Sequence, residues 1–446
     1  MRPWVSAFWS LLLVVALATV PAWAEDAALE EWGARIRSEL GGTTITVAAQ
    51  THPSTEAFQA MEREFEELTG IRVEWDVMEE IYLHDKLLTE HTARTGRYDV
   101  ISMDVTWIGE FAAKRVIDPL DPYLNDPKKT PVWFDYEDIV PAYAEGLGSY
   151  DGKVYGIPSA GESAFIAYRK DLFEKYGYDP ASIRTTEDLL EAARFFHGKE
   201  PGLAGISMRG RRGHHLVYAW FQFLYPYGGR VLAPGTTTVL VNSPEVVKSL
   251  QYYVELMKYA PTGVENFSHE EATTTFMQGQ AAIWFDATAL APWIEDVERS
   301  AVAGKVGYLP PPAGPDGAYG AVAGWNLALS SQSRNKDAAW AFIVYMTSRA
   351  KAEEYVNLGG VVTRLSVLNN PEFVKRYPYY PEIVASLELA NRLVEQGVDW
   401  RPRMPEWPRM GEILGLYGSQ ALVGQISAER AVEMAASEIQ ALFRRR

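Results

Sequence analysis

The chain has 446 residues, of which 47% are apolar and 22% charged, and it carries a net charge of −16. This composition is typical of a well-packed globular protein with room for two or three domains, and it excludes a disordered chain. The acidic balance disfavours binding to a nucleic-acid backbone or an anionic lipid surface, so we expect no nucleic acid and no membrane lipid as partner.

The first 24 residues have the pattern of a secretory signal peptide. Arg2 precedes an apolar run over residues 8–20, and Ala22-Trp23-Ala24 has the small-x-small form of a cleavage site. The run is shorter than the roughly 20 residues of a membrane-spanning helix, which favours cleavage over an uncleaved anchor. The chain has no cysteine, and therefore neither disulfides nor a lipid-attachment cysteine. We expect a free periplasmic protein of a double-membraned bacterium, beginning at Glu25.

Strands and helices alternate after an acidic segment over residues 25–40. The apolar periodicity predicts strands over 43–49, 71–77 and 98–103, a helix that ends at Gly70 and a helix near 82–94. This order implies right-handed crossovers and a mostly parallel sheet.

Ligands of such a sheet bind beyond the carboxyl ends of its strands. The segments that leave these ends are rich in hydrogen-bonding groups. They and the following helix start supply seven candidate ligand-binding residues: Gln50, His52, Glu79, Glu80, Tyr82, Asp104 and Trp107. The alternative role for Asp104 is to cap the helix that begins near Thr106.

The remaining chain predicts a second α/β unit and a largely helical C-terminal part. Helices are expected over 168–176, 186–196, 243–257 and 270–278, and strands over 205–208, 281–285 and 324–329. Further helices are expected over 336–346, 349–357, 381–395 and 428–443.

Several segments together resemble the extracellular sugar-binding proteins of ABC importers, the family 1 solute-binding proteins that include the maltose-binding protein. The segments are DGKVYGIP (151–158), YRKDLF (168–173), FMQGQAAI (276–283) and GWNLAL (324–329). The resemblance implies a two-lobed α/β fold of the type II periplasmic-binding-protein class, each lobe a mainly parallel sheet flanked by helices, with the ligand between the lobes.

The resemblance also implies three hinge crossings, near residues 163–167, 321–324 and 347–351. Lobe one would then comprise residues 25–163 and 324–347, and lobe two residues 164–323 and 348–446.

Further candidate ligand-binding residues lie near these crossings. The resemblance places a cleft carboxylate at Glu162, for which the alternative is an exposed loop residue. Trp325 follows a glycine at a crossing and is placed to stack on a ligand. Arg364 lies in a segment that resembles the family's loop after the third crossing.

The segment 209–215, RGRRGHH, is the densest cationic cluster of the chain. At least one arginine is expected to face the cleft, and Arg209 and Arg211 are candidate ligand-binding residues, as is the neighbouring His214. The alternative is a solvated basic loop. The His214-His215 pair lacks the i, i+4 spacing and the cysteine or carboxylate companions of a metal site, so we expect no metal.

Three more candidates are Trp284, Asp286 and Trp400; the alternative for Trp284, as for Trp325, is packing in the core, and the alternative for Trp400 is packing at the surface of lobe two. Trp284 and Asp286 lie at the end of a predicted strand, and Trp400 belongs to an aromatic and basic loop. Sugars and polyols present hydroxyls and weakly apolar C–H faces, which suit carboxylates, arginines and aromatic rings of this kind.

We therefore expect a monomeric binding protein that captures a carbohydrate or polyol and delivers it to a membrane-embedded ABC permease, without a cofactor. Closure on the ligand would present both lobes to the permease. The arginines leave an acidic sugar or a sugar or polyol phosphate open as ligand.

The rival hypothesis is an exported glycan-active enzyme with paired carboxylates. Glu79, Glu80, Asp104 and Glu162 offer such groups, but the sequence has no G-x-S-x-G elbow, H-E-x-x-H pair or P-loop.

Overall fold

The computed structural model describes residues 22–444. The predicted signal peptide therefore lies almost entirely outside the described residues. Among the described helices, none combines the length and the apolar content of a membrane-spanning segment.

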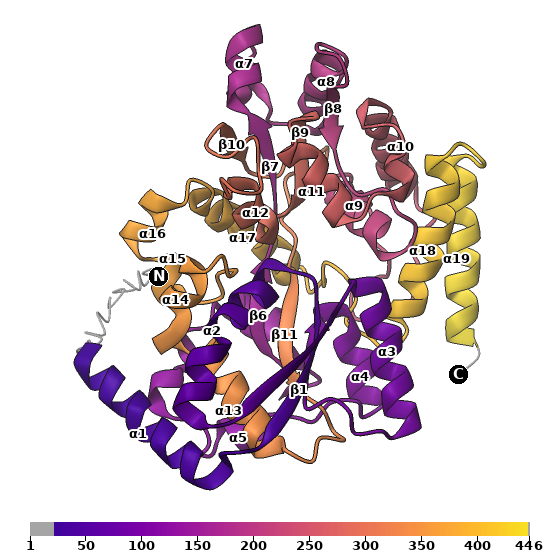
Figure 1. Cartoon of the computed structure of the whole chain (residues 1–446). Coiled ribbons are helices and arrows are strands. Elements are labelled where there is room, and N and C mark those ends of the chain that lie inside the picture. The colour runs from indigo at the N-terminus through magenta and orange to yellow at the C-terminus, as the bar shows by residue number, and fades with distance from the viewer. Residues whose placement is uncertain (1–21, 445–446) are drawn as a thin grey trace, which may run out of the picture.

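A five-stranded sheet organises the lower half of Figure 1. Its strands, in spatial order, are β2 (Arg72–Met78), β1 (Thr44–Gln50), β3 (Val100–Asp104), β11 (Ala323–Leu329) and β6 (Ile157–Glu162). β1 pairs in parallel with β2 and β3, whereas β11 runs antiparallel to β3 and β6. β6 consequently points the same way as β1 and β3.

A four-stranded sheet organises the upper half of Figure 1. Its strands, in spatial order, are β10 (Val306–Leu309), β7 (Ala164–Arg169), β9 (Ala281–Ala287) and β8 (Ala204–Ser207). β8 and β9 are parallel, and β7 is antiparallel to β9 and β10. Two further strands, β4 (Ser149–Tyr150) and β5 (Lys153–Val154), form a small hairpin.

Both main sheets are thus mixed. The predicted α/β fold is confirmed, and in each main sheet one strand runs against the others: β11 in the first sheet and β7 in the second, where β8, β9 and β10 point the same way. β11 and β7 adjoin the passages between the sheets. We call the first sheet with its covering helices lobe one, and the second sheet with its helices lobe two.

Helices cover both sheets. The α-helices in the chain before β11 are α1 (Ala22–Leu40), α2 (Pro53–Thr69), α3 (Glu80–Ala93), α4 (Ile108–Ala113), α5 (Asp121–Leu124), α6 (Pro141–Gly146), α7 (Lys170–Tyr176), α8 (Thr186–Phe196), α9 (His214–Leu224), α10 (Pro244–Leu256), α11 (His269–Met277) and α12 (Ala291–Glu295). Those after β11 are α13 (Lys336–Thr347), α14 (Ala352–Asn357), α15 (Leu365–Leu368), α16 (Pro371–Arg376), α17 (Tyr380–Glu395), α18 (Trp407–Leu422) and α19 (Ala428–Arg444).

Short 3-10 helices connect these elements. They are η1 (Val105–Trp107), η2 (Val132–Phe134), η3 (Tyr136–Asp138), η4 (Pro180–Ser182), η5 (Met257–Tyr259), η6 (Val264–Asn266), η7 (Thr288–Leu290) and η8 (Arg349–Lys351).

Local sequence signals account for several helix ends. His52 caps α2, whose first residue is Pro53, and α2 ends at Gly70 in a left-handed conformation. Capping boxes begin α8, at Thr185, and α11, at Ser268. The capping box at Ser268 fixes the position of His269, the first residue of α11.

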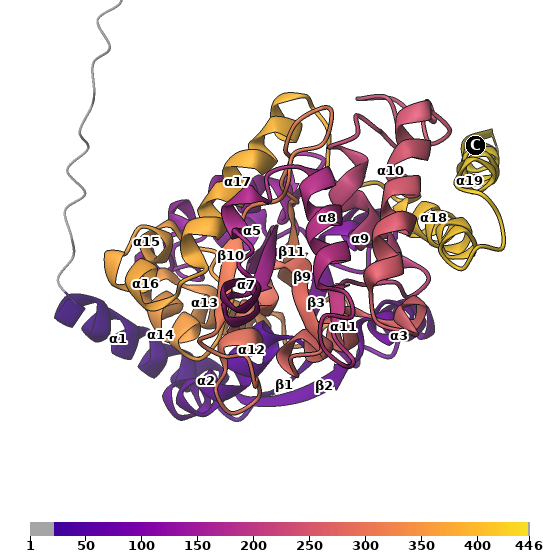
Figure 2. The same cartoon turned by 90° about the horizontal axis from the view of Figure 1, so that it is seen from above.

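The C-terminal helices complete lobe two and also contact lobe one. α17 packs on β7, and α18 and α19 lie beside α9 and α10 at one edge of the molecule (Figure 2). α14, by contrast, packs on α2 of lobe one, where Tyr355 stacks on Phe58. The lobe boundaries in this C-terminal part stay a prediction.

Segments far apart in the sequence also meet in lobe one. α1, for which the sequence predicted no element, packs against α2 and α13, and its Trp32 lies edge-on to Trp133. The buried indole rings thereby join the N-terminal helix to the core.

Gly324, near the start of β11, lies where β11 and β6 pack too closely to leave room for a side chain. Its φ is 141°, and a Cβ on it would lie 2.0 Å from the carbonyl oxygen of Ala160. Gly198 also has a positive φ, but a Cβ there meets no atom within 4 Å. We expect Gly198→Ala to cost about 1–2 kcal/mol for the left-handed backbone alone. Gly324→Ala should add an overpacking cost of about 1–3 kcal/mol. Equal losses of unfolding free energy in denaturant titrations would contradict this packing.

The contact between His84 and Glu110 predicts a pH dependence of stability. His84 Nε2 lies 2.7 Å from Glu110 Oε2, which joins α3 to α4, and Asp85 and Lys114 are the other charged neighbours of this pair. Burial lowers the pKa of His84, but the hydrogen bonds and charges of Glu110 and Asp85 outweigh it and raise the net pKa above its ordinary value.

The resulting stabilisation is complete below the unfolded pKa of about 6.5 and is lost as the pH rises through the raised folded value. His84→Asn should therefore lower the free energy of unfolding more at about pH 5.5 than at about pH 9. Urea titrations at both pH values measure this difference, and a pH-independent cost of the substitution would refute it.

Candidate functional site

Polar and aromatic side chains meet at the edge of the first sheet that faces lobe two. β1, β3 and β6 end at this edge with Gln50, Asp104 and Glu162. β11 begins there, so that Trp325 pairs with Asp104 in the register of the sheet. The strand-end rule therefore locates this edge correctly.

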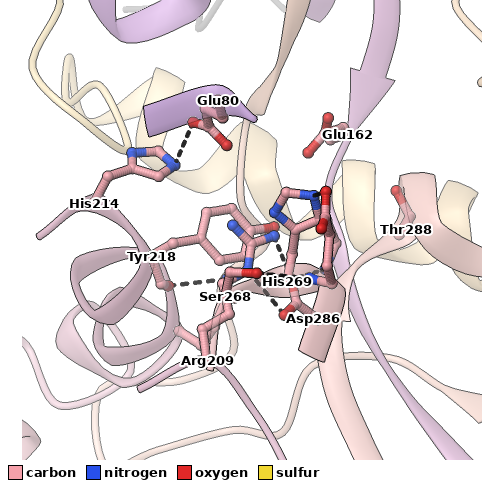
Figure 3. A network of polar contacts seen from close by, with 12 residues as sticks. Glu80, Glu162, Arg209, His214, Tyr218, Ser268, His269, Asp286 and Thr288 are labelled. Carbon is pink, nitrogen blue, oxygen red and sulfur yellow. Dashed lines mark hydrogen bonds and ion pairs between the residues drawn. The ribbon is translucent and has the colours of Figure 1, made fainter. Parts of the chain in front are cut away.

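A cavity of about 20 Å³ lies between the lobes. Lobe one lines it with Gln50, His52, Glu80, Asp104, Glu162 and Trp325. Lobe two and the loop before α18 line it with Arg209, His214, Tyr218, His269, Ala287, Leu290 and Arg401. Figure 3 shows Glu80 and Glu162 on one side of the cleft, and Arg209, Tyr218, His269 and Asp286 on the other.

The cap of α2 orients a histidine toward Glu162. His52 Nδ1 accepts a hydrogen bond from the backbone N–H of Ser54, which leaves Nε2 as the protonated nitrogen. Nε2 lies 3.3 Å from Glu162 Oε1, and both side chains are buried. The helix terminus thus fixes the tautomer of a residue that lines the cavity.

Asp104 has the capping role that the sequence offered as an alternative, and it also lines the cavity. Its Oδ1 accepts a hydrogen bond from the N–H of Thr106 and caps η1. Its Oδ2 lies 3.4 Å from Arg401 Nη2. The side chains of Asp104 and Arg401 are almost fully buried, so this contact between the lobes replaces water for both charges.

Arg209 is the arginine of the cationic segment that enters the cavity. Its Nε lies 2.9 Å from both carboxylate oxygens of Asp286, which stands behind it at the end of β9. The guanidinium lies 4.0 Å from the ring centre of Tyr218. Burial opposes the charge of Arg209, but the carboxylate of Asp286 outweighs burial and raises the pKa of Arg209. Lobe two therefore presents a fixed cation.

Glu80 and His214 form a second contact between the lobes, drawn in Figure 3. His214 Nδ1 accepts from Arg401 Nη1 at 3.1 Å, so Nε2 carries the proton and faces Glu80 Oε1 at 3.0 Å. Burial and the neighbouring charge of Asp104 raise the pKa of Glu80 to about 8. Burial and the charges of Arg401 and Arg209 lower the pKa of His214.

Several buried polar atoms at the cavity have no hydrogen-bond partner among the described residues. They are Nε2 and Oε1 of Gln50, Nε2 of His269 and Nε of Arg401, and Oε1 of Glu162 has only its 3.3 Å contact with His52. Buried polar groups are nearly always paired in proteins, because an unpaired one costs about 1–3 kcal/mol. These donors and acceptors are available to the hydroxyls of a ligand.

Trp325 provides the apolar surface of the site. Its ring lies 5.5 Å from the ring of Trp107 at an interplanar angle of 89°, which holds the indole in place. Trp107 does not line the cavity but a wider groove beside it.

Other predicted residues lie at the entrance. Glu79 and Arg211 form an ion pair between the lobes, and both remain partly exposed. Tyr82 is 61% exposed and lies outside the cavity lining. These residues face the groove or the solvent.

Three candidates lie behind the cavity. Trp284 has no exposed surface and packs against Phe165 and Phe276 in the core of lobe two. Asp286 reaches the cavity only through Arg209. Trp400 packs behind Tyr218, at 5.1 Å between ring centres.

Arg364 is a structural residue in this fold. Its Nε donates to the carbonyl oxygen of Thr347 at 3.0 Å, and Nη1 donates to the carbonyl oxygen of Asp135. Burial lowers the pKa of Arg364 to about 10. Its guanidinium joins η2 and η3 to the end of α13, outside the cavity lining.

The sequence analysis missed Tyr218, His269 and Arg401, together with the aliphatic Ala287 and Leu290. Tyr218 lies on α9, which has no apolar periodicity. His269 follows a capping-box serine, a signal that gives the helix start but not the direction of the side chain. Arg401 is the neighbour of Trp400 in a loop already singled out.

Chemically, the cavity combines carboxylate, imidazole, amide and guanidinium groups with one exposed indole face. Such groups bind several hydroxyls at once while the indole covers C–H surface. Arg209 is paired within lobe two, and Arg401 is paired across the cleft.

Comparison with known proteins agrees with this architecture. A mannitol-binding protein of Pseudomonas aeruginosa is 27% identical over 414 residues, which cover 89% of this chain and 92% of the relative. An erythritol/L-threitol-binding protein of Mycolicibacterium smegmatis is 29% identical over 340 residues, which cover 72% of this chain and 70% of the relative.

A solved ABC transporter solute-binding protein from Agrobacterium radiobacter K84, in complex with ribitol, has a similar fold. Its TM-score is 0.83 at 29% identity, covering 90% of this chain and 99% of that one. The family model described as bacterial extracellular solute-binding protein matches residues 48–353, more than half of the chain. This chain therefore belongs to the family of bacterial extracellular solute-binding proteins.

Proposed function

We propose that the protein binds an uncharged acyclic polyol of about the size of one sugar unit in the interlobe cavity and delivers it to an ABC permease. The observation that carries the proposal is the small, strongly polar cavity, in which the amide of Gln50 has no hydrogen-bond partner among the described residues and Oε1 of Glu162 has only its contact with His52. Relatives that bind mannitol, erythritol and ribitol support it.

The size of the cavity favours a small ligand. Its volume of about 20 Å³ is far below the range of about 300–1,000 Å³ for small-molecule sites, so a ligand enters only when the lining side chains or the lobes move apart, and a small ligand needs the least movement. The contacts Asp104–Arg401 and Glu80–His214 close the cavity between the lobes. An oligosaccharide would need these contacts to open.

The lining favours an open-chain ligand over a sugar ring. Trp325 offers one aromatic face, whereas the ring of Tyr218 is covered by the guanidinium of Arg209. Rings of sugars present broad C–H faces that stack on aromatic side chains, but an extended polyol presents a hydroxyl at each carbon. The many polar groups of the cavity match this second pattern.

The charge of the lining favours a neutral ligand over a phosphate. Both arginines of the cavity already have carboxylate partners, Asp286 for Arg209 and Asp104 for Arg401. A phosphate would have to displace a buried carboxylate and approach the Glu162 side chain.

The proposal includes a carrier role in the periplasm. The extracellular family, the signal-like residues 1–24 and the absence of cysteine support a free, exported protein. We propose that it acts as a monomer and releases its ligand unchanged to the permease. Ligand contacts from both lobes would stabilise the closed form, which presents both lobes to the permease together.

Ligand choice is the first prediction of this proposal. We expect ribitol, mannitol or erythritol to bind with a stoichiometry of one and to raise Tm, because each can pair the free polar atoms of the cavity. Ribitol 5-phosphate and maltose should bind more weakly than the neutral polyols. Calorimetry measures the affinities, and chromatography of the recovered ligand checks that it is unchanged. Tighter binding of maltose, or chemical conversion of a polyol, would contradict the proposal.

The second prediction concerns two lining residues. Glu162→Gln and Trp325→Ala should each weaken polyol binding about 10- to 100-fold, because a charged hydrogen bond or a stacking surface is worth about 1.5–3 kcal/mol. Tyr82→Ala serves as the matched control and should leave the affinity unchanged. Circular dichroism verifies the fold of each variant. Unchanged affinity in both cavity variants would remove these residues from the site.

A further inference from the structure

Four of the seven histidines of the chain gather at the interlobe cleft: His52, His214, His215 and His269. His52 and His214 are engaged in the contacts described above. His269 also lines the cavity, whereas His215 has no role in the contacts described above.

His215 and His269 are buried with unpaired ring nitrogens. His215, in the first turn of α9, is 1% exposed, and neither of its ring nitrogens has a hydrogen-bond partner among the described residues. His269, the first residue of α11, is 5% exposed, and its Nε2 is likewise unpaired. Each unpaired nitrogen costs free energy that a bound group could recover.

A carboxylate from the opposite lobe completes the cluster. One oxygen of Glu80, at the start of α3, and one nitrogen each of His215 and His269 all lie within 4.8 Å of one another. Figure 3 shows Glu80 and His269 on opposite sides of the cleft. Zinc binds such ligands at about 2.0–2.2 Å, so the three side chains must move toward a common centre to hold the ion.

A second group of possible metal ligands consists of Glu80, Asp104 and His214, whose ligand atoms also lie within 4.8 Å of one another. Asp104 and His214, however, already have hydrogen-bond partners. Asp104 caps η1 and contacts Arg401, and His214 accepts a hydrogen bond from Arg401. The unpaired nitrogens distinguish the first group.

The local charges permit a cation. The two nearest guanidinium groups each have a carboxylate partner, Asp286 for Arg209 and Glu79 for Arg211. Burial, together with these charges, lowers the pKa of both His215 and His269. The two imidazoles are therefore neutral, the form whose lone pair binds metals.

We propose that Glu80, His215 and His269 form a site for one divalent cation of the zinc class that joins the two lobes. Two imidazoles and one carboxylate suit zinc and neighbouring transition metals rather than calcium or magnesium. Because lobe one supplies Glu80 and lobe two supplies both histidines, the cation binds the closed form best and stabilises it.

The absence of a metal pattern in the sequence has a physical explanation. The three ligands come from three separate helix starts, and no helical spacing relates them. The neighbouring pair His214-His215 is divided in the fold, since His214 contacts Arg401 and His215 faces His269.

The test uses tag-free protein freed of polyol and metal. Titration with ZnCl2 should show one binding step of unit stoichiometry, and Co2+ should give the visible absorption of a low-coordinate site with nitrogen ligands. His215→Asn and His269→Gln should each abolish both signals, whereas His197→Gln, at an exposed histidine of lobe two, should leave them unchanged. Failure of the wild-type protein to bind either metal would overturn the proposal. The same holds for binding that survives in both folded variants.

A scattering experiment tests the interlobe geometry. Zinc should decrease the radius of gyration of the wild-type protein but not that of Glu80→Gln, which retains only the two ligands of lobe two. Equal compaction of both proteins, or none in the wild type, would refute the joining of the lobes by the metal.

Discussion

Charged side chains that become buried must pair with an opposite charge. In the cleft, some of these ion pairs form within one lobe and others form between the two lobes. Arg209 and Asp286 are paired inside lobe two, so that half of the site is fixed whatever lobe one does. Asp104 and Arg401 form their ion pair only when the lobes are closed. Opening returns these two charges to water, and closing exchanges water for the partner. The net gain is small, which leaves the balance between open and closed forms to the ligand.

The alternating strands and helices from β1 to β3 could be predicted from the sequence, and the helices that were missed have local causes. β1, α2, β2, α3 and β3 show clear periodicity and form close to the predicted positions. α9 was missed because its residues 215–224 are all buried, which removes the polar face that marks a helix. α18 was missed because it contains three glycines, Gly411, Gly415 and Gly418.

The glycines of α18 have a packing role that propensity does not reveal. A Cβ on Gly415 would lie 2.4 Å from the Cα of Gly213, immediately before α9. Close approach of the two segments therefore requires glycine on both sides of the contact. Such a requirement depends on tertiary structure and leaves no periodic signal.

The candidate site was predictable in lobe one and only partly in lobe two. Strand ends converge by topology, so Gln50, His52 and Asp104 could be named from strand positions alone, and family resemblance added Glu162. In lobe two the correct segments were found but not always the correct side chain. Trp400 was chosen where its neighbour Arg401 lines the cavity, and Trp284 points into the core. A side-chain direction depends on packing, which the sequence does not specify residue by residue.

The register between β6 and β11 has a mechanical consequence. Glu162, the last residue of β6, pairs with Ala323, the first residue of β11, so these two passages between the lobes lie side by side. Residues 163–322 are therefore, in topological terms, one long insertion between two adjacent strands of a sheet. Adjacent strands are about 4.8 Å apart, so a rotation axis near both passages changes their backbone angles little. A rotation of the lobes about such an axis would displace most the residues far from the strands, at the rim of the cleft where Glu79 and Arg211 meet.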